Sequence, residues 1–345
     1  MRLLNTTTLE FEEFFDTEQV KHKYSILSHC WSQDRSQPEV SHQAFLSKSY
    51  DENGAGYQKI RRCCELSKER GHVYTWIDTC CVDKTSSAEL SETINSMFAW
   101  YRDSAECYVF MDDLSVDVLA EVEEIDAEGH WRQGLGREAI TDVYAFTDSG
   151  WFARGWTLQE LLAPRNVLFY NVNARFLGTK SDLAAPIAHA TGIDSAIIRG
   201  QQNIFDTSIA QRMSWASARK TTRLEDTAYC MLGIFDVNMP LLYGERKKAF
   251  ARLQEAIIRQ SDDQSIFAWG LGKDQMYVTS VLAAEPSAFR GCGTIARDHR
   301  KDKKNWIRSV RKARYRNYVG ARFLDMAATT RESRILAITY VSSYR

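Results

Sequence analysis

Residues 73–111 read VYTWIDTCCVDKTSSAELSETINSMFAWYRDSAECYVFM, and this stretch decides the predicted fold. Residues 73–78 are dense in β-branched and aromatic side chains, which is typical of a buried strand. The run from Ser86 to Glu89 resembles a capping box, so we expect a helix to begin there. A second strand, residues 107–111, follows this helix directly. Strand, helix and strand at this spacing predict a parallel sheet with right-handed crossovers.

The same pattern continues on both sides of this stretch. Residues 24–28 alternate apolar and polar side chains and predict a strand. Residues 56–71 have apolar positions at helical spacing and end at a glycine suited to a helix C-cap. A helix beginning near Trp156 and a strand at residues 167–170 complete the unit. We therefore expect an α/β fold in which helices flank a parallel sheet, with the functional groups at the carboxyl ends of the strands.

The expected organisation has three parts. Residues 1–180 form the α/β core, residues 181–270 form a helical extension packed on that core, and residues 271–345 form a tail without an assigned structure. The helices of the extension are predicted at residues 183–191, 209–218, 224–232 and 247–260.

Two segments carry charge of a single sign. Residues 112–128 contain eight acidic side chains and no Lys or Arg, which indicates a solvated loop. Nine of the seventeen residues from Arg300 to Arg316 are Lys or Arg. We interpret this basic segment as a surface segment peripheral to function, with nucleic-acid or acidic-partner binding as the alternative. Deleting it is expected to leave activity intact.

The composition excludes several classes of protein. The 345 residues include 44 Lys and Arg against 45 Asp and Glu, and 44% of them are hydrophobic. A chain of this kind can bury a core and has no overall charge that attracts nucleic acid or an anionic membrane. No stretch approaches the roughly 18 apolar residues of a membrane span. Without a recognisable signal peptide, we expect a cytoplasmic protein.

The eight cysteines include two adjacent pairs, Cys63-Cys64 and Cys80-Cys81. Adjacent cysteines fit neither a disulfide framework nor the usual zinc spacing, so we interpret them as reduced core thiols. Motifs of phosphate-binding loops, zinc proteases and serine hydrolases are absent from the sequence. No pair of histidines has a convincing metal-ligand spacing, and we expect neither a metal nor a bound cofactor.

Polar residues embedded in aromatic sequence remain as candidates at the expected sheet edge. Trp156 and Glu160 are spaced i, i+4 and so share one face of the predicted helix. A carboxylate beside an indole could serve in acid–base chemistry or stabilise a cation, or it could form a structural ion pair with Arg154. The residues alone leave both alternatives open. The candidates are Ser28, His29, Trp31, Asp78, Arg154, Trp156 and Glu160.

Three blocks resemble the fungal heterokaryon-incompatibility (HET) domain. They are YSILSHCW at residues 24–31, WIDTCCVDK at residues 76–84 and RGWTLQEL at residues 154–161. Ser32 departs from the family pattern, which has Gly after the Trp, so this loop lacks the backbone freedom that Gly would give it. The resemblance extends over about residues 1–270, with further similar segments at residues 1–6, 89–98, 223–235 and 239–245.

This resemblance implies a death effector of fungal non-self recognition. HET domains are also similar to TIR domains, which are flavodoxin-like, and several TIR domains cleave NAD with a helix Glu in a W-x-x-x-E pattern. Residues 156–160 have that spacing, so the resemblance implies that Glu160 is the catalytic carboxylate and that NAD is the substrate. Ser28, His29, Trp31, Asp78, Arg154 and Trp156 are the implied substrate-binding residues.

We expect these residues to lie in a cleft at the carboxyl edge of the sheet. There Arg154 would hold a phosphate of NAD, and His29 and Asp78 would form hydrogen bonds with its ribose hydroxyls. The resemblance further implies self-association through the domain and an upstream receptor with a nucleotide-binding oligomerisation domain. A HET-domain adaptor without chemistry of its own is the alternative.

Overall fold

The computed structural model describes residues 1–32, 34, 36–117, 137–270 and 280–296. Contacts between residues divide the chain into two compact units, Met1–Gln202 and Asn203–Arg345, and each is described by itself. The basic segment at residues 300–316 lies outside the described residues, as does the acidic segment beyond residue 117. The expectation that the helical extension packs on the α/β core stays a prediction.

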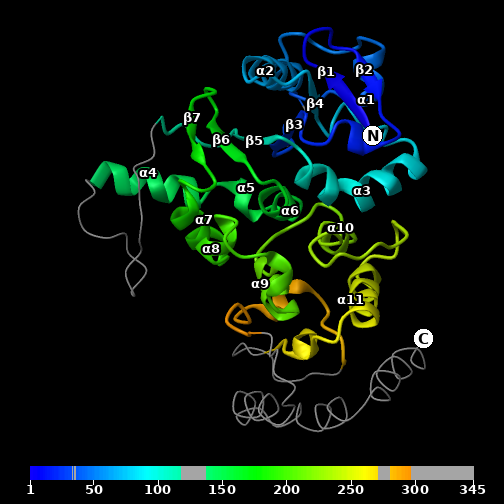
Figure 1. The fold of residues 1–345 in the computed structure, drawn as a ribbon, viewed down its shortest axis with the longest axis vertical. Helices are drawn as coiled ribbons and strands as arrows, with labels where there is room; N and C mark the ends of the chain where they lie inside the picture. The colour runs from blue at the N-terminus through cyan, green and yellow to red at the C-terminus, as the bar shows by residue number, and fades with distance from the viewer. Residues whose placement is uncertain (33, 35, 118–136, 271–279, 297–345) are drawn as a thin grey trace. The chain divides into compact units, whose positions relative to one another are not determined.

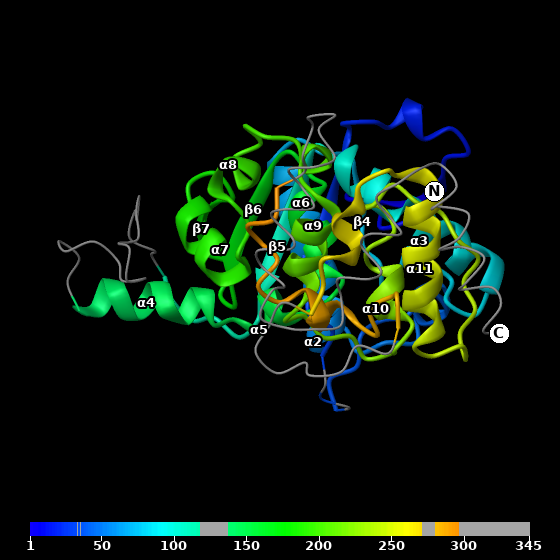
Figure 2. The ribbon, with the colours of Figure 1, turned by 90° about the horizontal axis from the view of Figure 1, so that it is seen from below.

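The first unit contains a mixed β-sheet (Figures 1 and 2). Its seven strands lie in the order β2-β1-β4-β3-β5-β6-β7. The four strands β4, β3, β5 and β6 are parallel neighbours, whereas β2, β1 and β7 join the sheet by antiparallel pairing. The predicted α/β class is confirmed. The strands are β1 (Arg2–Asn5), β2 (Phe11–Glu13), β3 (Tyr24–His29), β4 (Tyr74–Trp76), β5 (Glu106–Met111), β6 (Val167–Asn171) and β7 (Phe176–Thr179).

Helices lie on both faces of this sheet. Figure 1 shows α2 on the opposite side of the strands from α3 and α6. The strand order accounts for this arrangement. The connection from β3 to β4 runs one way along the sheet and that from β4 to β5 runs back, so the right-handed crossovers usual for parallel strands place α2 and α3 on opposite faces. The helices are α1 (His42–Leu46), α2 (Ala55–Glu69), α3 (Ser87–Arg102), α4 (Arg137–Thr147), α5 (Gly150–Ala153), α6 (Thr157–Leu162), α7 (Ala184–Thr191) and α8 (Ser195–Ile198), with a 3₁₀ turn, η1, at Thr17–Gln19.

The local signals for α2 and α3 are confirmed in detail. Gly71 follows α2 with φ of +84°, the left-handed conformation that glycine adopts without strain. Ser86 caps α3 by accepting a hydrogen bond from the Glu89 backbone N–H at 3.3 Å. The Glu89 side chain, however, bonds the backbone N–H of Asp83 at 2.8 Å, so this cap extends into the preceding loop.

The antiparallel strands β1, β2 and β7 were not predicted. Each has only three or four residues, which is too short for an alternating pattern to identify. In β1, the adjacent side chains Leu3 and Leu4 are both fully buried. A strand buried on both faces does not alternate, so its sequence resembles any short apolar run.

The described part of the second unit, residues 203–270 and 280–296, is helical. Its elements are η2 (Ile204–Asp206), α9 (Ile209–Ala216), α10 (Asp226–Tyr229), α11 (Lys248–Gln260), η3 (Gln264–Phe267) and η4 (Pro286–Phe289). The buried Gln254 side chain of α11 donates to the carbonyl of Ala283 and accepts from its N–H, both at 2.9 Å. This pair of bonds ties α11 to the segment before η4.

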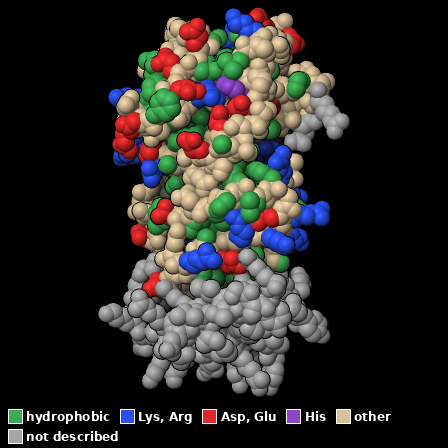
Figure 3. All heavy atoms as spheres, turned by 90° about the vertical axis from the view of Figure 1, so that its right-hand side faces the viewer, with side chains coloured by type: hydrophobic (Ala, Val, Ile, Leu, Met, Phe, Trp, Pro, Cys, Tyr) green, Lys and Arg blue, Asp and Glu red, His purple; other side chains and the backbone are tan. Residues whose placement is uncertain are grey.

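Acidic and basic side chains of the described residues are interspersed on the face that Figure 3 presents, with hydrophobic side chains between them. This mixture agrees with the near-zero net charge of the chain. Within the described ranges, no helix combines the length and the apolar character that crossing a membrane requires.

Candidate functional site

A cleft opens at the carboxyl ends of the parallel strands in the first unit. In open α/β sheets, ligands bind where the direction of strand order reverses, and here that point lies between β3 and β5. The cleft has a volume of about 980 Å³. Its wall includes Cys30 after β3, Asp112 after β5, and Arg154 after α5. Lys59 and Trp151 also line it.

Glu160 lies in a buried hydrogen-bonded chain next to this cleft. The Ser28 hydroxyl donates to Glu160 Oε2 at 2.5 Å, and Trp151 Nε1 donates to Ser28 Oγ at 2.9 Å. Glu160 is 8% exposed, Ser28 is 1% exposed and Trp151 is fully buried. Trp151 belongs to the cleft wall, whereas Ser28 and Glu160 are not among the residues that line the cleft. The carboxylate is therefore connected to the cleft through two side chains.

His29 lies between two carboxylates. Its Nε2 is 3.7 Å from Glu39 Oε1, and its Nδ1 is 3.9 Å from Asp78 Oδ1. Both distances are too long for a hydrogen bond, and Nε2 has no hydrogen-bond partner. Burial and the nearby Lys59 ammonium lower the pKa of His29 to about 4, against the opposing effect of the carboxylates. The imidazole is therefore neutral at physiological pH.

Lys59 connects three segments at the cleft. Its Nζ is 2.9 Å from Glu39 Oε1 and 3.2 Å from Asp112 Oδ2, and it donates to the carbonyl of Cys30 at 3.4 Å. Burial opposes ionisation of Glu39, but the Lys59 ammonium and the hydrogen bonds from Lys59 and the Ser32 N–H outweigh it and lower the pKa of Glu39. The result is a charged network that holds the ends of β3 and β5 against α2.

Asp78 and Trp31 form a second pair at the end of β4. Trp31 Nε1 donates to Asp78 Oδ2 at 3.0 Å, and Lys84 Nζ lies 3.5 Å from the same oxygen. The Lys84 ammonium also lies 3.6 Å from the centre of the Trp31 ring, a cation–π contact. Burial opposes ionisation of Asp78, yet the Lys84 ammonium and the hydrogen bond from Trp31 lower its pKa. Trp31, at 38% exposed, offers an aromatic surface to the cleft.

The structure places the predicted site residues on both faces of the sheet, and only some of them line the cleft. Ser28 and His29 are neighbours on β3, so their side chains point to opposite faces of the sheet. Ser28 meets Glu160 of α6, while His29 lies near Lys59 of α2 and near Asp78. Among the predicted residues, Trp31 and Arg154 line the cleft directly. The half-buried Trp156 is the N-cap residue of α6 and is not among the residues that line the cleft.

Sequence reasoning missed Trp151, Lys59 and Glu39 as members of the site. Trp151 stands five residues before Trp156, but the W-x-x-x-E spacing favoured the latter. Lys59 is one of several charged residues on α2, and Glu39 lies in a loop, so neither has a local signal. Asp113 could have been found from the sequence, because it follows the carboxyl end of β5. Its carboxylate accepts from Ser149 Oγ and from the Gly150 N–H, both at 2.7 Å, and so orients the start of α5.

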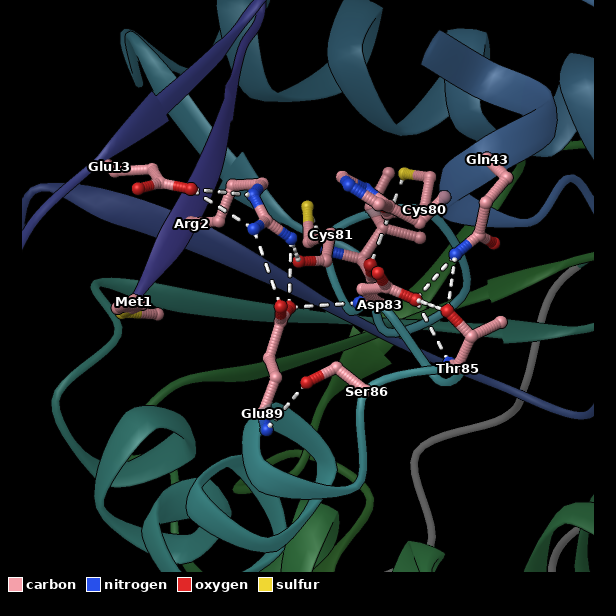
Figure 4. Close-up of polar contacts among 12 residues, drawn as sticks. Met1, Arg2, Glu13, Gln43, Cys80, Cys81, Asp83, Thr85, Ser86 and Glu89 are labelled. Carbon is pink, nitrogen blue, oxygen red and sulfur yellow. Dashed lines mark hydrogen bonds and ion pairs between the residues drawn. The ribbon is translucent and has the colours of Figure 1, made fainter. Parts of the chain in front are cut away.

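The second motif block has a structural role that Figure 4 shows. Arg2 Nη1 donates to the carbonyl of Cys81 at 3.2 Å and to Glu89 Oε1 at 2.8 Å. The same Glu89 oxygen accepts from the Asp83 N–H at 2.8 Å. The Asp83 carboxylate in turn accepts from the N–H and hydroxyl of Thr85 at 2.9 and 2.6 Å. The loop after β4 is thus held by β1 and by the start of α3.

The cysteines of the first unit offer no nucleophile to the cleft. All eight cysteines are free thiols, and seven of them are buried. Cys30 is partly exposed and lines the cleft, but burial raises its pKa to about 12. The thiolate, which is the reactive form, is therefore scarce at neutral pH. Of the described residues, no group of three or more His, Cys, Asp or Glu side chains is arranged to hold a metal ion.

The sheet, the cleft and the three motif blocks define an α/β domain that matches a known family. Residues 24–160 match the family model described as "Heterokaryon incompatibility protein (HET)", so the resemblance to the HET domain is confirmed for this part of the chain. Residues 248–304 match a second model, described as "Domain of unknown function (DUF8212)".

A particular relative matches over a longer range. The chain is 43% identical over 235 residues to "Vegetative incompatibility protein HET-E-1" of Podospora anserina. This alignment covers 68% of the chain but only 16% of the relative, so the chain spans a small part of that protein's length. No solved structure matches the chain significantly.

Proposed function

We propose that this chain is the effector part of a vegetative incompatibility protein, and that its HET domain hydrolyses NAD. The family match of residues 24–160 and the 43% identity to the Podospora protein support the role in incompatibility. The proposed chemistry rests on one observation, the cleft at the sheet edge whose wall residue Trp151 connects through Ser28 to the carboxylate of Glu160.

In the proposed reaction, water cleaves the bond between nicotinamide and ribose. The C1′–N bond breaks, nicotinamide leaves with the bonding electron pair, and water adds to C1′ and releases a proton. Positive charge develops at C1′ in the transition state, and a nearby carboxylate stabilises such charge. Glu160 supplies this carboxylate. Arg154 offers a planar guanidinium to the pyrophosphate, and Trp31 offers an aromatic surface to a planar ring.

Glu160 must become accessible for this reaction. Its carboxylate is buried behind the cleft wall and accepts a hydrogen bond from Ser28. We therefore include self-association of the domain in the proposal, as the step that opens the cleft wall in front of Glu160 while Ser28 keeps its bond to the carboxylate. The proposed setting is cytoplasmic, with a receptor that carries a nucleotide-binding oligomerisation domain upstream.

The proposal is tested by expressing the full chain in cells that lack it. Glu160→Gln keeps the size of the side chain but removes its charge, so NAD loss and cell death should both stop. Glu69→Gln, an exposed position at the end of α2, is the matched control and should behave as wild type. NAD content, cell survival and protein amount are measured for each variant.

A non-enzymatic adaptor is the second candidate function. The burial of Glu160 and its bond to Ser28 favour this alternative, because a carboxylate so placed can serve packing alone. An adaptor predicts that Glu160→Gln still kills cells while NAD content stays constant. Cell death without NAD loss in the wild type would select the adaptor and reject the enzyme.

A further inference from the structure

We propose that Trp151 is a positioning residue that holds the Glu160 carboxylate through Ser28. This inference deepens the proposed function and rests on it. Trp151 does not belong to the W-x-x-x-E pattern, whose tryptophan is Trp156. The contact that reaches Glu160 through Ser28 comes from Trp151 instead.

The direction of the hydrogen-bonded chain follows from the chemistry of its members. An indole N–H can only donate, so Ser28 Oγ must be the acceptor of the Trp151 bond. A hydroxyl has one proton, and in this geometry it goes to Glu160 Oε2 at 2.5 Å. A hydroxyl that accepts one bond becomes a stronger donor in the next. The indole therefore both orients the Ser28 hydroxyl and strengthens its bond to the carboxylate.

The indole of Trp151 is itself held rigidly. Its ring packs edge-on against Phe152 and Phe169, with ring centres 5.1 and 5.6 Å away. Its backbone carbonyl accepts from Thr157 Oγ1 at 2.6 Å, at the first residue of the helix that carries Glu160. Ser149 caps its backbone N–H and bonds Asp113 in the cleft wall. The cleft and Glu160 therefore share this one residue as a common support.

The test combines Trp151→Phe with Ser28→Ala in purified full-length protein. Phe keeps one aromatic ring and removes the N–H donor together with the second ring of the indole, so a control for the lost volume is needed. We expect Trp151→Phe to lower kcat for NAD hydrolysis about 10- to 100-fold, as for other groups that orient a functional side chain, with KM changed less than about 3-fold. Because Trp151 acts through Ser28, the double variant should be no slower than Ser28→Ala alone.

Trp100→Phe is the matched control, because Trp100 is a buried tryptophan of α3 that packs against Trp76 in the same unit. If Trp151→Phe is as active as this control, or if its effect multiplies with that of Ser28→Ala, the positioning role is wrong while the proposed function stands. A wild-type protein that cleaves no NAD at any protein concentration overturns the proposed function, and the positioning role with it.

Discussion

At the scale of single residues, Ser28 and His29 show how one strand serves two environments. Ser28 donates to Glu160 on one face of the sheet, and His29 lies near Glu39 and Asp78 on the other. The buried imidazole has no hydrogen-bond partner at Nε2. A charged imidazole would be stabilised by the carboxylates, but burial and Lys59 outweigh them and keep the ring neutral.

This burial predicts a loss of stability in mild acid. The pKa of His29 falls from 6.5 to about 4 on folding, so between these values the unfolded chain binds the proton and the native protein does not. The free energy of unfolding therefore decreases as pH falls from 7 to 4.5, by roughly 2–3 kcal/mol from this residue. Urea denaturation at several pH values should show this slope in the wild type and a shallower one in His29→Gln. Equal slopes in both proteins would contradict the assignment.

At the scale of elements, the helix that carries Glu160 depends on its surroundings. Helix α6 has only six residues, which is too short to be stable alone. Thr157 at its start donates to the carbonyls of Trp151 and Arg154, at 2.6 and 2.9 Å. Lys180 donates to the carbonyls of Leu161 and Pro164 at its end, although burial lowers the pKa of Lys180 to about 8. Both ends of the helix are thus fixed by side chains.

The loop after β4 gives a prediction at the scale of elements. Glu89 accepts hydrogen bonds from Arg2 and from the Asp83 N–H, so Glu89→Ala leaves the Asp83 N–H without its acceptor and removes one of the ion pairs of Arg2. We expect the free energy of unfolding to fall by about 1–3 kcal/mol. Glu89→Gln retains one acceptor oxygen and should cost about 1 kcal/mol. Urea denaturation measures both, and a Glu89→Ala cost below about 0.5 kcal/mol would show that this cluster does not hold the loop.

At the scale of the whole molecule, the parallel sheet could be predicted because three of its strands have five or six mostly buried residues. The fourth, β4, has only three residues, but β-branched and aromatic side chains mark it. The strands β3, β5 and β6 begin and end within one or two residues of the predicted bounds. Because these strands are parallel, their carboxyl ends meet along one edge of the sheet, and the observed cleft lies there. The short strands β1, β2 and β7 have no comparable pattern.

The sequence does not predict which of the site residues contact one another. Strand alternation separates Ser28 from His29, but the sequence does not show which helix covers which face. The contact between Trp151 and Ser28 joins residues 123 positions apart, and the bond from Ser28 to Glu160 spans 132. Contacts of this kind depend on the packed fold rather than on local spacing. The catalytic and substrate-binding roles of the seven predicted residues remain predictions.

The most direct test of the central claim is nicotinamide release by the purified full chain. Wild-type protein and the Glu160→Gln variant are compared over a range of protein concentrations, so that self-association is covered. We predict nicotinamide release by the wild type that rises more than proportionally with protein concentration, and none by Glu160→Gln at a melting temperature close to that of the wild type. Equal release by a folded Glu160→Gln protein, or none by the wild type at any concentration, would contradict the claim.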